Sequence, residues 1–310
     1  MFIRQLDYLV TLARERHFAR AAEACCVSQP ALSAAIRHLE EELGVVIVER
    51  GHKFVGFTDD GERLLNWARQ TLVAWDGLRQ EASLSRKRLS GSLRIGAIPT
   101  TMPVMSLLTG PYWRAYPDLT QLLQSMSNEA IIRKLENFEL DIGVTYLEDQ
   151  NLDRFRVLPL YRERYVLLTR DAAALGARSS LSWKEAAELP LCLLTRNMQN
   201  RRIIDAAFKR AGARPHVVVE TDSVFALYSN VLCTEICSIM PHSLLAHFDK
   251  REELKVVPLT PELHRKIGIV TLDNDPTSPI VSAIWSVTER MDLDARFDFS
   301  SANERAEITR

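Results

Sequence analysis

Three polar side chains on one short segment have the types and spacing that suit direct contact with another molecule. In Ser28–Gly44, SQPALSAAIRHLEEELG, they are Gln29, Ser33 and Arg37, which an α-helix places on one face. An amide can pair with adenine, a guanidinium can bind guanine or a phosphate, and a hydroxyl has looser preference. The face therefore suits the major groove of duplex DNA, with Pro30 beside it. Most polar helix faces are simply solvated, so the surrounding sequence has to show whether this face binds DNA or only faces solvent.

The same segment carries the marks of a helix with one buried side. Leu32, Ile36, Leu39 and Leu43 recur at helical spacing away from the polar residues, which predicts one apolar stripe. The serine that opens the segment can cap the first turn, and Gly44 suits the exit position. We therefore expect a helix with both ends defined by sequence.

Neighbouring segments predict the elements that would position this helix. Phe18–Cys26, FARAAEACC, predicts a short helix that meets the first one across a tight turn, and Arg4–Arg16 predicts a supporting helix. After Gly44, VVIVERGHKFVGFT predicts a β-hairpin whose tip could reach a phosphate or the minor groove. The candidate tip residues are Arg50, His52 and Lys53.

The segment 2–58, with FARAAEACCVSQPALSAAIRHLEEELGVVIVER at its centre, resembles the amino-terminal DNA-binding domain of the LysR-type transcriptional regulators. The resemblance implies a multidomain α and α/β protein. Its expected parts are a winged helix-turn-helix, a long linker helix and a two-subdomain α/β effector-binding domain resembling periplasmic binding proteins. The chain departs from the family at Ala34, where a long polar or basic side chain is common, so specificity should depend more on Gln29, Ser33 and Arg37.

A long helix is predicted to follow the hairpin. From Asp59 or Asp60 to about Arg88 the chain shows a heptad-like apolar spacing, and so long a stripe needs a partner. The stripe comprises Leu64, Ala68, Thr71, Trp75, Leu78 and Ala82. We expect a dimerisation helix, which suits a two-fold symmetric DNA site.

Beyond the helix, strands and helices alternate, which predicts an open, largely parallel sheet with helices on both faces. We expect the DNA-binding domain over 1–58, the linker helix and hinge over 59–90, the effector-binding domain over 91–300 and a frayed tail over 301–310. The resemblance implies subdomain I from 91–163 and 266–300, and subdomain II from 164–265.

Polar residues follow several predicted strands, where helix N-termini offer unpaired N–H groups to a small anion. Each is also an ordinary helix cap, but LysR-type proteins place their effector cleft at these strand ends. The candidate effector-binding residues are Thr100, Thr101, Ser127, Asn128, Thr145, Thr195 and Arg196. The expected effector is a small, carboxylate-like anion.

Composition excludes several other classes of protein. The 310 residues are 46% hydrophobic and 25% charged with a net charge of −1, so a nonspecific basic DNA binder is disfavoured. Neither a membrane-spanning run nor a signal peptide is evident, so we expect a cytoplasmic protein without a membrane partner. P-loop, GxGxxG, GxSxG and HExxH motifs are missing, so no enzyme, cofactor or metal site is expected.

These observations predict a homo-oligomeric transcriptional regulator, a dimer or tetramer, that binds promoter DNA and a small-molecule effector. It would also contact RNA polymerase if it is an activator. Two alternatives stay open. One is a redox-responsive regulator of the same architecture, for which Cys233 and Cys237 are the pair to test. The other is a small-anion solute-binding protein without a transcriptional role.

Overall fold

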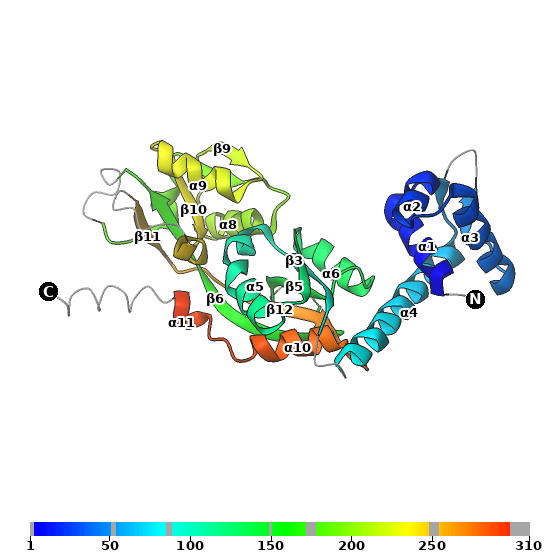
Figure 1. Cartoon of the computed structure of the whole chain (residues 1–310). Coiled ribbons are helices and arrows are strands. Elements are labelled where there is room, and N and C mark those ends of the chain that lie inside the picture. The colour runs from blue at the N-terminus through cyan, green and yellow to red at the C-terminus, as the bar shows by residue number, and fades with distance from the viewer. Residues whose placement is uncertain are drawn as a thin grey trace.

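The computed structural model describes residues 3–50, 54–84, 89–148, 151–171, 178–247 and 254–297. A small, mainly helical domain at the N-terminal end is joined by one long helix to a larger α/β part (Figure 1). No helix within these ranges combines the length and apolar character that crossing a membrane would require.

The N-terminal domain packs three helices and a hairpin around a small core. The elements are α1 (Ile3–Glu15), α2 (Phe18–Ala24), α3 (Gln29–Leu43), β1 (Val48–Arg50) and β2 (Phe54–Phe57). The two strands pair antiparallel, which confirms the predicted hairpin. Leu9, Leu12, Leu32, Ile36 and Leu39 are buried at its centre. The apolar stripe of α3 thus holds the helix against the domain and leaves the other side free.

The prediction that Leu43 belongs to this buried stripe was wrong. Leu43 is 42% exposed, because it lies in the last turn of α3, beyond the helices that cover the stripe.

The turn between α2 and α3 contains a backbone feature that the sequence did not suggest. Cys26 has a φ of 55°, in the left-handed region that glycine usually fills.

The helix α4 (Asp59–Leu84) leaves the hairpin directly. Gly61 is required at its start, since a Cβ there would lie 2.1 Å from the carbonyl oxygen of Ile47. The prediction that the helix reaches Arg88 concerns residues 85–88, which lie outside the described ranges. Along α4, Trp67, Trp75 and Leu78 are 66%, 42% and 62% exposed, which leaves an apolar strip that no other part of the described ranges covers.

The larger part is an α/β domain. Its strands are β3 (Gly91–Ala97), β4 (Leu119–Ser125), β5 (Ile142–Tyr146), β6 (Phe155–Thr169), β7 (Leu181–Ser182), β8 (Leu191–Leu194), β9 (Val217–Thr221), β10 (Cys237–Pro241), β11 (Lys255–Thr260) and β12 (His264–Leu272). Its helices are η1 (Pro99–Met105), α5 (Ser106–Ala115), α6 (Asn128–Glu136), α7 (Trp183–Ala187), α8 (Gln199–Arg210), α9 (Val224–Cys233), η3 (His242–His247), α10 (Pro279–Thr288) and α11 (Asp294–Phe297).

These strands form one sheet of order β4-β3-β5-β12-β6-β10-β8-β9, with β11 beside β6 and β7. The sheet is more mixed than predicted: β3 pairs parallel with β4 and β5, and β8 with β9 and β10, but β12 and β6 run antiparallel to their neighbours. Antiparallel return strands arise because β6 and β12 close the two lobes rather than continue either βαβ series.

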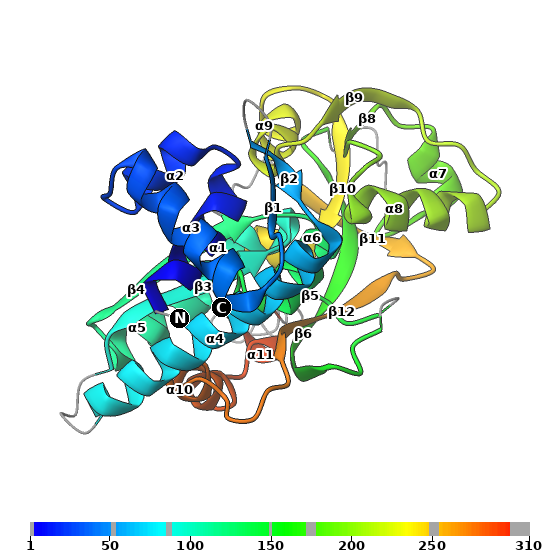
Figure 2. The ribbon, with the colours of Figure 1, turned by 90° about the vertical axis from the view of Figure 1, so that its right-hand side faces the viewer.

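The strand β6 divides the sheet into two lobes. Its first part, Phe155–Arg164, pairs with β12, while its last part, Tyr165–Thr169, pairs with β10 and β11. One lobe therefore holds β3, β4 and β5 and the other holds β8, β9 and β10, as Figure 2 shows from a second direction. The lobes meet where this single strand changes partners.

The segment that follows β3 folds as two elements. The 3₁₀-helix η1 comes first and α5 begins only at Ser106. Pro103 lies inside η1 and cannot donate a backbone hydrogen bond, which explains why the regular α-helix starts only after it.

Candidate DNA-binding helix and effector cleft

The start and end of α3 are fixed by the residues that the sequence indicated. The Ser28 hydroxyl accepts a hydrogen bond from the Ala31 amide at 3.3 Å, and Pro30 occupies the first turn. At the other end Gly44 takes a φ of 69°. Both ends of α3 are therefore defined by short-range chemistry.

The face of α3 opposite the core carries the predicted contacts. Gln29, Pro30 and Arg37 are exposed and Ser33 is half-buried. His38 lies on a different side of α3, where it is exposed and its ring Nδ1 lies 3.2 Å from the Gln5 side-chain amide nitrogen of α1. Gln29, Ser33 and Arg37 give one surface with an amide, a hydroxyl and a guanidinium, which are groups that bind base edges and phosphates.

The hairpin is tied to α3 by one carboxylate. The Glu40 Oε1 atom accepts hydrogen bonds from the amides of Ile47 at 2.9 Å and Val48 at 3.0 Å, so the wing leaves α3 in a fixed direction. The predicted tip contacts lie outside what the structure describes: residues 51–53 include His52 and Lys53, and the side chain of Arg50 is likewise outside.

A cleft of about 320 Å³ opens between the two lobes. Its walls are three places where a strand passes into a helix: the start of η1, the start of α6 and, from the opposite lobe, the start of α8. The lining residues are Ile98, Pro99, Thr100, Ser125, Met126, Ser127, Asn128, Tyr146, Leu194, Asn197, Met198, Gln199, Asn200 and Asp222. Helix starts that converge on one space can bind a small anion without a cationic side chain.

The structure brings three of the predicted effector-binding residues to this cleft, namely Thr100, Ser127 and Asn128. The other four are not among its lining residues. The Thr101 hydroxyl donates to the Ile98 carbonyl at 2.9 Å, and the Thr145 hydroxyl donates to the Asn128 side-chain oxygen.

The remaining two predicted residues belong to the opposite lobe. Thr195 follows β8, and its buried hydroxyl has no hydrogen-bond partner within the described part of the chain. The Arg196 side chain is 77% exposed and lies 3.6 Å from the Glu220 carboxylate. Thr145 thus supports a cleft residue from behind, whereas Arg196 pairs at the surface.

The cleft has a distinct electrostatic character. Its lining, within the described ranges, includes Asp222 but neither lysine nor arginine. Met198, the residue before α8, makes no side-chain capping hydrogen bond, so the first-turn amides of α8 remain available to a ligand. At α6, by contrast, the Ser127 hydroxyl accepts from the Ala130 amide at 3.2 Å.

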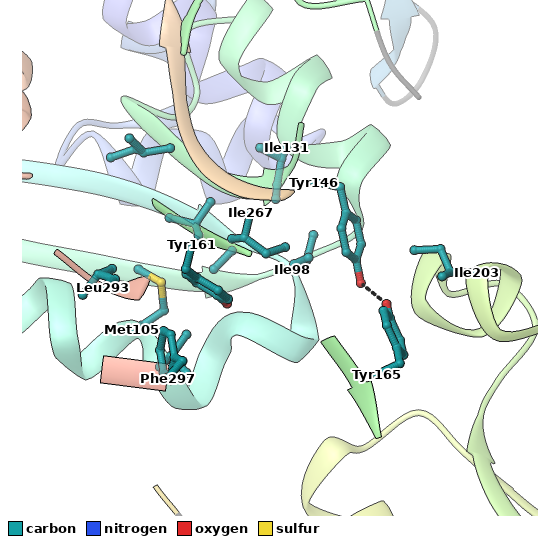
Figure 3. Close-up of a cluster of buried hydrophobic side chains, with 14 of the residues drawn as sticks. Ile98, Met105, Ile131, Tyr146, Tyr161, Tyr165, Ile203, Ile267, Leu293 and Phe297 are labelled. Carbon is teal, nitrogen blue, oxygen red and sulfur yellow. Dashed lines mark hydrogen bonds between the residues drawn. The ribbon is translucent and has the colours of Figure 1, made fainter. Parts of the chain in front are cut away.

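Tyrosine hydroxyls link the two lobes at the inner end of the cleft. The hydroxyls of Tyr146 and Tyr165 lie 3.3 Å apart (Figure 3), and Asn200 Nδ2 donates to Tyr165 at 3.2 Å. The Thr100 hydroxyl lies 3.5 Å from that of Tyr146. Burial, assisted by the nearby Glu163, raises the pKa of Tyr146 above its ordinary value, so the hydroxyl stays neutral and can donate.

Glu163 lies behind these tyrosines, next to the point where β6 changes partners. It is fully buried, and neither carboxylate oxygen has a hydrogen-bond partner among the residues that the structure describes. Burial, helped by the negative charge of Glu148, raises the pKa of Glu163 to about 8, although the nearby Tyr165 hydroxyl acts to lower it. The side chain is therefore a neutral acid at neutral pH.

Sequence reasoning missed several cleft residues, among them Met126, Asn200 and Asp222. Met126 and Asp222 come just after strands β4 and β9, so the strand-end rule that selected Ser127 could have found them. Asn200 lies within the first turn of α8 and no local pattern distinguishes it.

The cysteines are not arranged for an easy disulfide. Cys192 and Cys237 lie on the neighbouring strands β8 and β10, but Cys237 is opposite Leu191, and the two thiols enter different cores on opposite faces of the sheet. Burial raises the pKa of both thiols. Cys233 is exposed at the end of α9, which packs on the face away from the Cys237 side chain.

A winged helix-turn-helix, a long connecting helix and a two-lobed α/β domain with a cleft define a ligand-responsive DNA-binding regulator as the class of this protein. Family models agree: residues 3–62 match the bacterial regulatory helix-turn-helix protein, lysR family, and residues 86–291 match the LysR substrate binding domain. The chain belongs to the LysR family of transcriptional regulators.

Relatives of known activity match over nearly the full length. The chain is 31% identical over 302 residues to the DNA-binding transcriptional dual regulator OxyR of Escherichia coli, covering 96% of this chain and 98% of that one. It is 30% identical over 279 residues to a hydrogen peroxide-inducible genes activator of Haemophilus influenzae, covering 89% and 92%.

Solved structures show the same arrangement. A full-length OxyR of Pseudomonas aeruginosa with a cysteine-to-aspartate substitution matches with a TM-score of 0.73 and 28% identity, covering 93% of this chain and 97% of that one. CbnR in complex with its target DNA shares the fold, with a TM-score of 0.64 and 20% identity, covering 94% and 99%.

Proposed function

We propose that α3 binds operator DNA in the major groove through Gln29, Ser33 and Arg37, with Pro30 at the groove edge. Exposure of this face, its fixed ends and the rigid link from Glu40 to the wing support the assignment. The wing tip, with Arg50, His52 and Lys53, would bind phosphate or the adjacent minor groove. The net charge of −1 implies that recognition depends on these placed groups rather than on bulk attraction.

The proposed effector is a small monocarboxylate held in the cleft. The observation that carries this proposal is the convergence of the starts of η1, α6 and α8 on one space without a lining lysine or arginine. Helix N-termini favour one negative charge, while Ile98, Leu194 and the two methionines offer an apolar wall. Asp222 would repel a second carboxylate, so a hydroxyl or amino group on the ligand is expected to face it.

A thermal-shift screen of small hydroxy- and amino-carboxylates against the full-length chain tests this site. A binding acid raises the melting temperature of the wild type, because ligand that binds only the folded state stabilises it. Thr100→Val removes the cleft hydroxyl and should abolish that shift, while Thr120→Val, on the exposed edge strand β4, should keep it. Equal shifts in Thr100→Val and wild type would place the site elsewhere.

Pairing of α4 helices from two chains is the proposed dimer contact. Trp67, Trp75 and Leu78 form the exposed apolar strip that such a contact would cover. Two α3 helices joined in this way would meet two half-sites of a symmetric operator. The residue boundaries proposed for the domains are those of the sequence analysis, with the effector-binding domain divided at β6.

A redox response is the second candidate, because the relatives in Haemophilus influenzae and Escherichia coli include hydrogen peroxide-inducible activators. The placement of Cys192, Cys237 and Cys233 argues against a disulfide within the effector-binding domain. Hydrogen peroxide treatment followed by mass spectrometry of non-reduced peptides decides between the two. A stoichiometric Cys233–Cys237 bond would favour the redox candidate over the carboxylate.

A further inference from the structure

One face of α4 is bound to the lobe that contains α6. Arg69 and Gln80 are the side chains that make the contact, and they lie eleven residues apart, which is close to three helical turns. They therefore project from the same side of the helix, about 16 Å apart along its axis. This side differs from the one that carries the exposed tryptophans Trp67 and Trp75.

The first contact is an ion pair. Arg69 Nη2 lies 3.2 Å from Glu139 Oε1, and the Arg69 side chain is only 15% exposed. The second Glu139 oxygen accepts from Lys134 Nζ, on α6, at 2.7 Å. Glu139 therefore joins the last turn of α6 to the linker helix.

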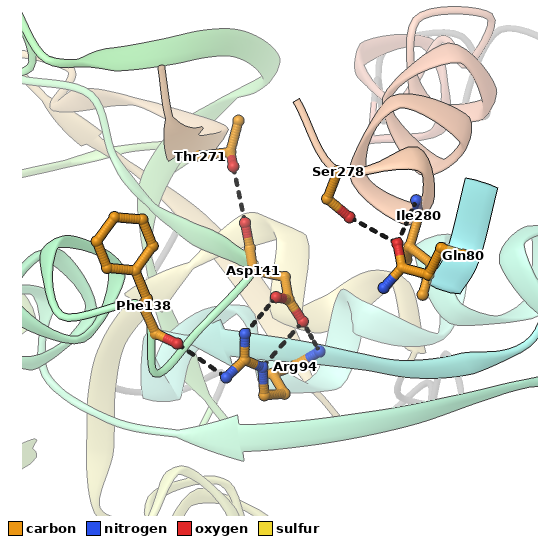
Figure 4. A network of polar contacts seen from close by, with 7 residues as sticks. All are labelled: Gln80, Arg94, Phe138, Asp141, Thr271, Ser278 and Ile280. Carbon is orange, nitrogen blue, oxygen red and sulfur yellow. Dashed lines mark hydrogen bonds and ion pairs between the residues drawn. The ribbon is translucent and has the colours of Figure 1, made fainter. Parts of the chain in front are cut away.

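The second contact is a helix cap supplied from a distance. Ser278, the residue before α10, makes no capping bond of its own. Instead, Gln80 Oε1 accepts from the Ser278 hydroxyl at 2.9 Å and from the Ile280 amide at 3.3 Å (Figure 4). A side chain of α4 thus satisfies a backbone donor at the start of α10, which favours a defined position for the linker helix.

The loop between these contacts is joined to neighbouring strands by several hydrogen bonds. Arg94 donates to Asp141 Oδ1 at 2.6 Å and to the Phe138 carbonyl at 2.8 Å, while the Thr271 hydroxyl donates to the Asp141 carbonyl at 2.8 Å (Figure 4). Burial lowers the pKa of Arg94, but Asp141, with further contributions from Asp76 and Glu139, raises it above its ordinary value. These bonds tie the segment that presents Glu139 to β3.

The opposite end of α6 lies in the cleft. Ser127 and Asn128 line the cleft, and Asn128 accepts the bond from Thr145. Between the two ends the helix packs closely on the sheet, since a Cβ at Gly143 would lie 2.3 Å from Ile131. One short, tightly packed helix therefore touches the cleft at its start and the linker helix just beyond its end.

We propose that Arg69–Glu139 and Gln80–Ser278/Ile280 form a latch that fixes the linker helix to the effector-binding domain, and that α6 transmits the state of the cleft to this latch. The proposal rests on the proposed function, since a regulator needs its cleft coupled to its DNA-binding domain. Coupling requires an element with two arrangements that both sites can bias, and α6 is positioned to be that element.

Pulsed electron–electron double resonance tests the latch in the full-length chain. Spin labels are placed at the exposed Cys26 and at Arg114→Cys on α5, with Cys25→Ser and Cys233→Ser, and labelled protein is diluted with unlabelled protein. We expect a single narrow distance. Arg69→Ala should replace it with a broad distribution, whereas Arg63→Ala, which removes an exposed pair with Asp60 on the same helix, should retain it.

Further variants test the Arg69–Glu139 ion pair and the transmission through α6. The double variant Arg69→Ala/Glu139→Ala should give a distance distribution no broader than that of either single variant, because both substitutions remove the same ion pair.

Asn128→Ala, at the cleft end of α6, should shift the mean distance, and Arg133→Ala on the exposed side of α6 should not. An unchanged narrow distance in Arg69→Ala overturns the latch, and an unchanged mean in Asn128→Ala overturns the transmission. The samples contain neither DNA nor carboxylate, so failure of the proposed function would leave these outcomes intact.

Discussion

The DNA-binding domain and the effector cleft are assembled in opposite ways. The residues proposed to contact DNA, Gln29, Ser33 and Arg37, all belong to α3, and their common face follows from helical spacing alone. The cleft instead gathers residues from Ile98 to Asp222, which come from two lobes that exchange strands at β6. A contiguous site is specified by local sequence, whereas a distributed site depends on how distant elements pack.

The largest predicted effect is on the stability of the two-lobed domain that contains the cleft. The pKa of Glu163 is raised from 4.5 to about 8 in the folded chain. A group with a raised folded pKa contributes full stability below its unfolded pKa, and this contribution is lost as pH rises through the folded value. The wild type should therefore lose on the order of 4 kcal/mol relative to Glu163→Gln between pH 4.5 and 8.

Urea unfolding of both proteins across this pH range measures the effect. The two curves should meet near pH 4 and separate as pH rises, with Glu163→Gln the more stable at pH 8. If the pair shows the same stability at all pH values, Glu163 is ionised in the fold and our assignment of a neutral acid at the lobe junction is wrong.

The second prediction concerns the core beneath the contiguous site. Leu39→Ala should destabilise the DNA-binding domain by about 2 to 5 kcal/mol, because Leu39 is fully buried and its loss leaves a cavity. Leu43→Ala on the same helix should change stability by no more than about 0.5 kcal/mol, since Leu43 is 42% exposed. Thermal unfolding of the full-length variants separates them, and a similar cost for both would contradict the observed burial.

The smallest predicted effect compares caps in the two regions. Ser28→Ala removes the acceptor for the Ala31 amide and should cost about 1 kcal/mol in the DNA-binding domain. Ser127→Ala removes the equivalent cap of α6 and should cost a similar amount, but only this variant should weaken carboxylate binding. Calorimetric unfolding of each variant measures the loss of stability, and calorimetric titration measures carboxylate binding. An equal loss of carboxylate binding in both variants would contradict the assignment of Ser127 to the cleft.

The same contrast explains what sequence reasoning could predict. The ends of α3, its stripe from Leu32 to Leu39 and the hairpin follow from periodicity and capping, which are short-range rules. The predicted burial of Leu43 was wrong, because exposure at a helix end depends on where the neighbouring helices stop.

In the larger domain the order of strands and helices was predictable, but their pairing was not. The antiparallel course of β6 and β12 depends on lobe closure, which leaves no local signal. Thr100, Ser127 and Asn128 reach the cleft because strand ends are natural ligand sites. Asn200 joins them only through packing of α8 against the opposite lobe, and Arg196 leaves the cleft to pair with Glu220.

Selection of binding sites from random duplex DNA by the full-length chain tests the central claim most directly. We predict enrichment of a two-fold symmetric sequence, and a loss of about 1 to 3 kcal/mol of discrimination at one base position of each half-site in Arg37→Ala. Arg63→Ala, on the linker helix, should select the same sequence as the wild type. Equal recovery of all duplexes by the wild type, or an unchanged selected sequence in Arg37→Ala, would contradict the assignment of α3 as the helix that recognises DNA.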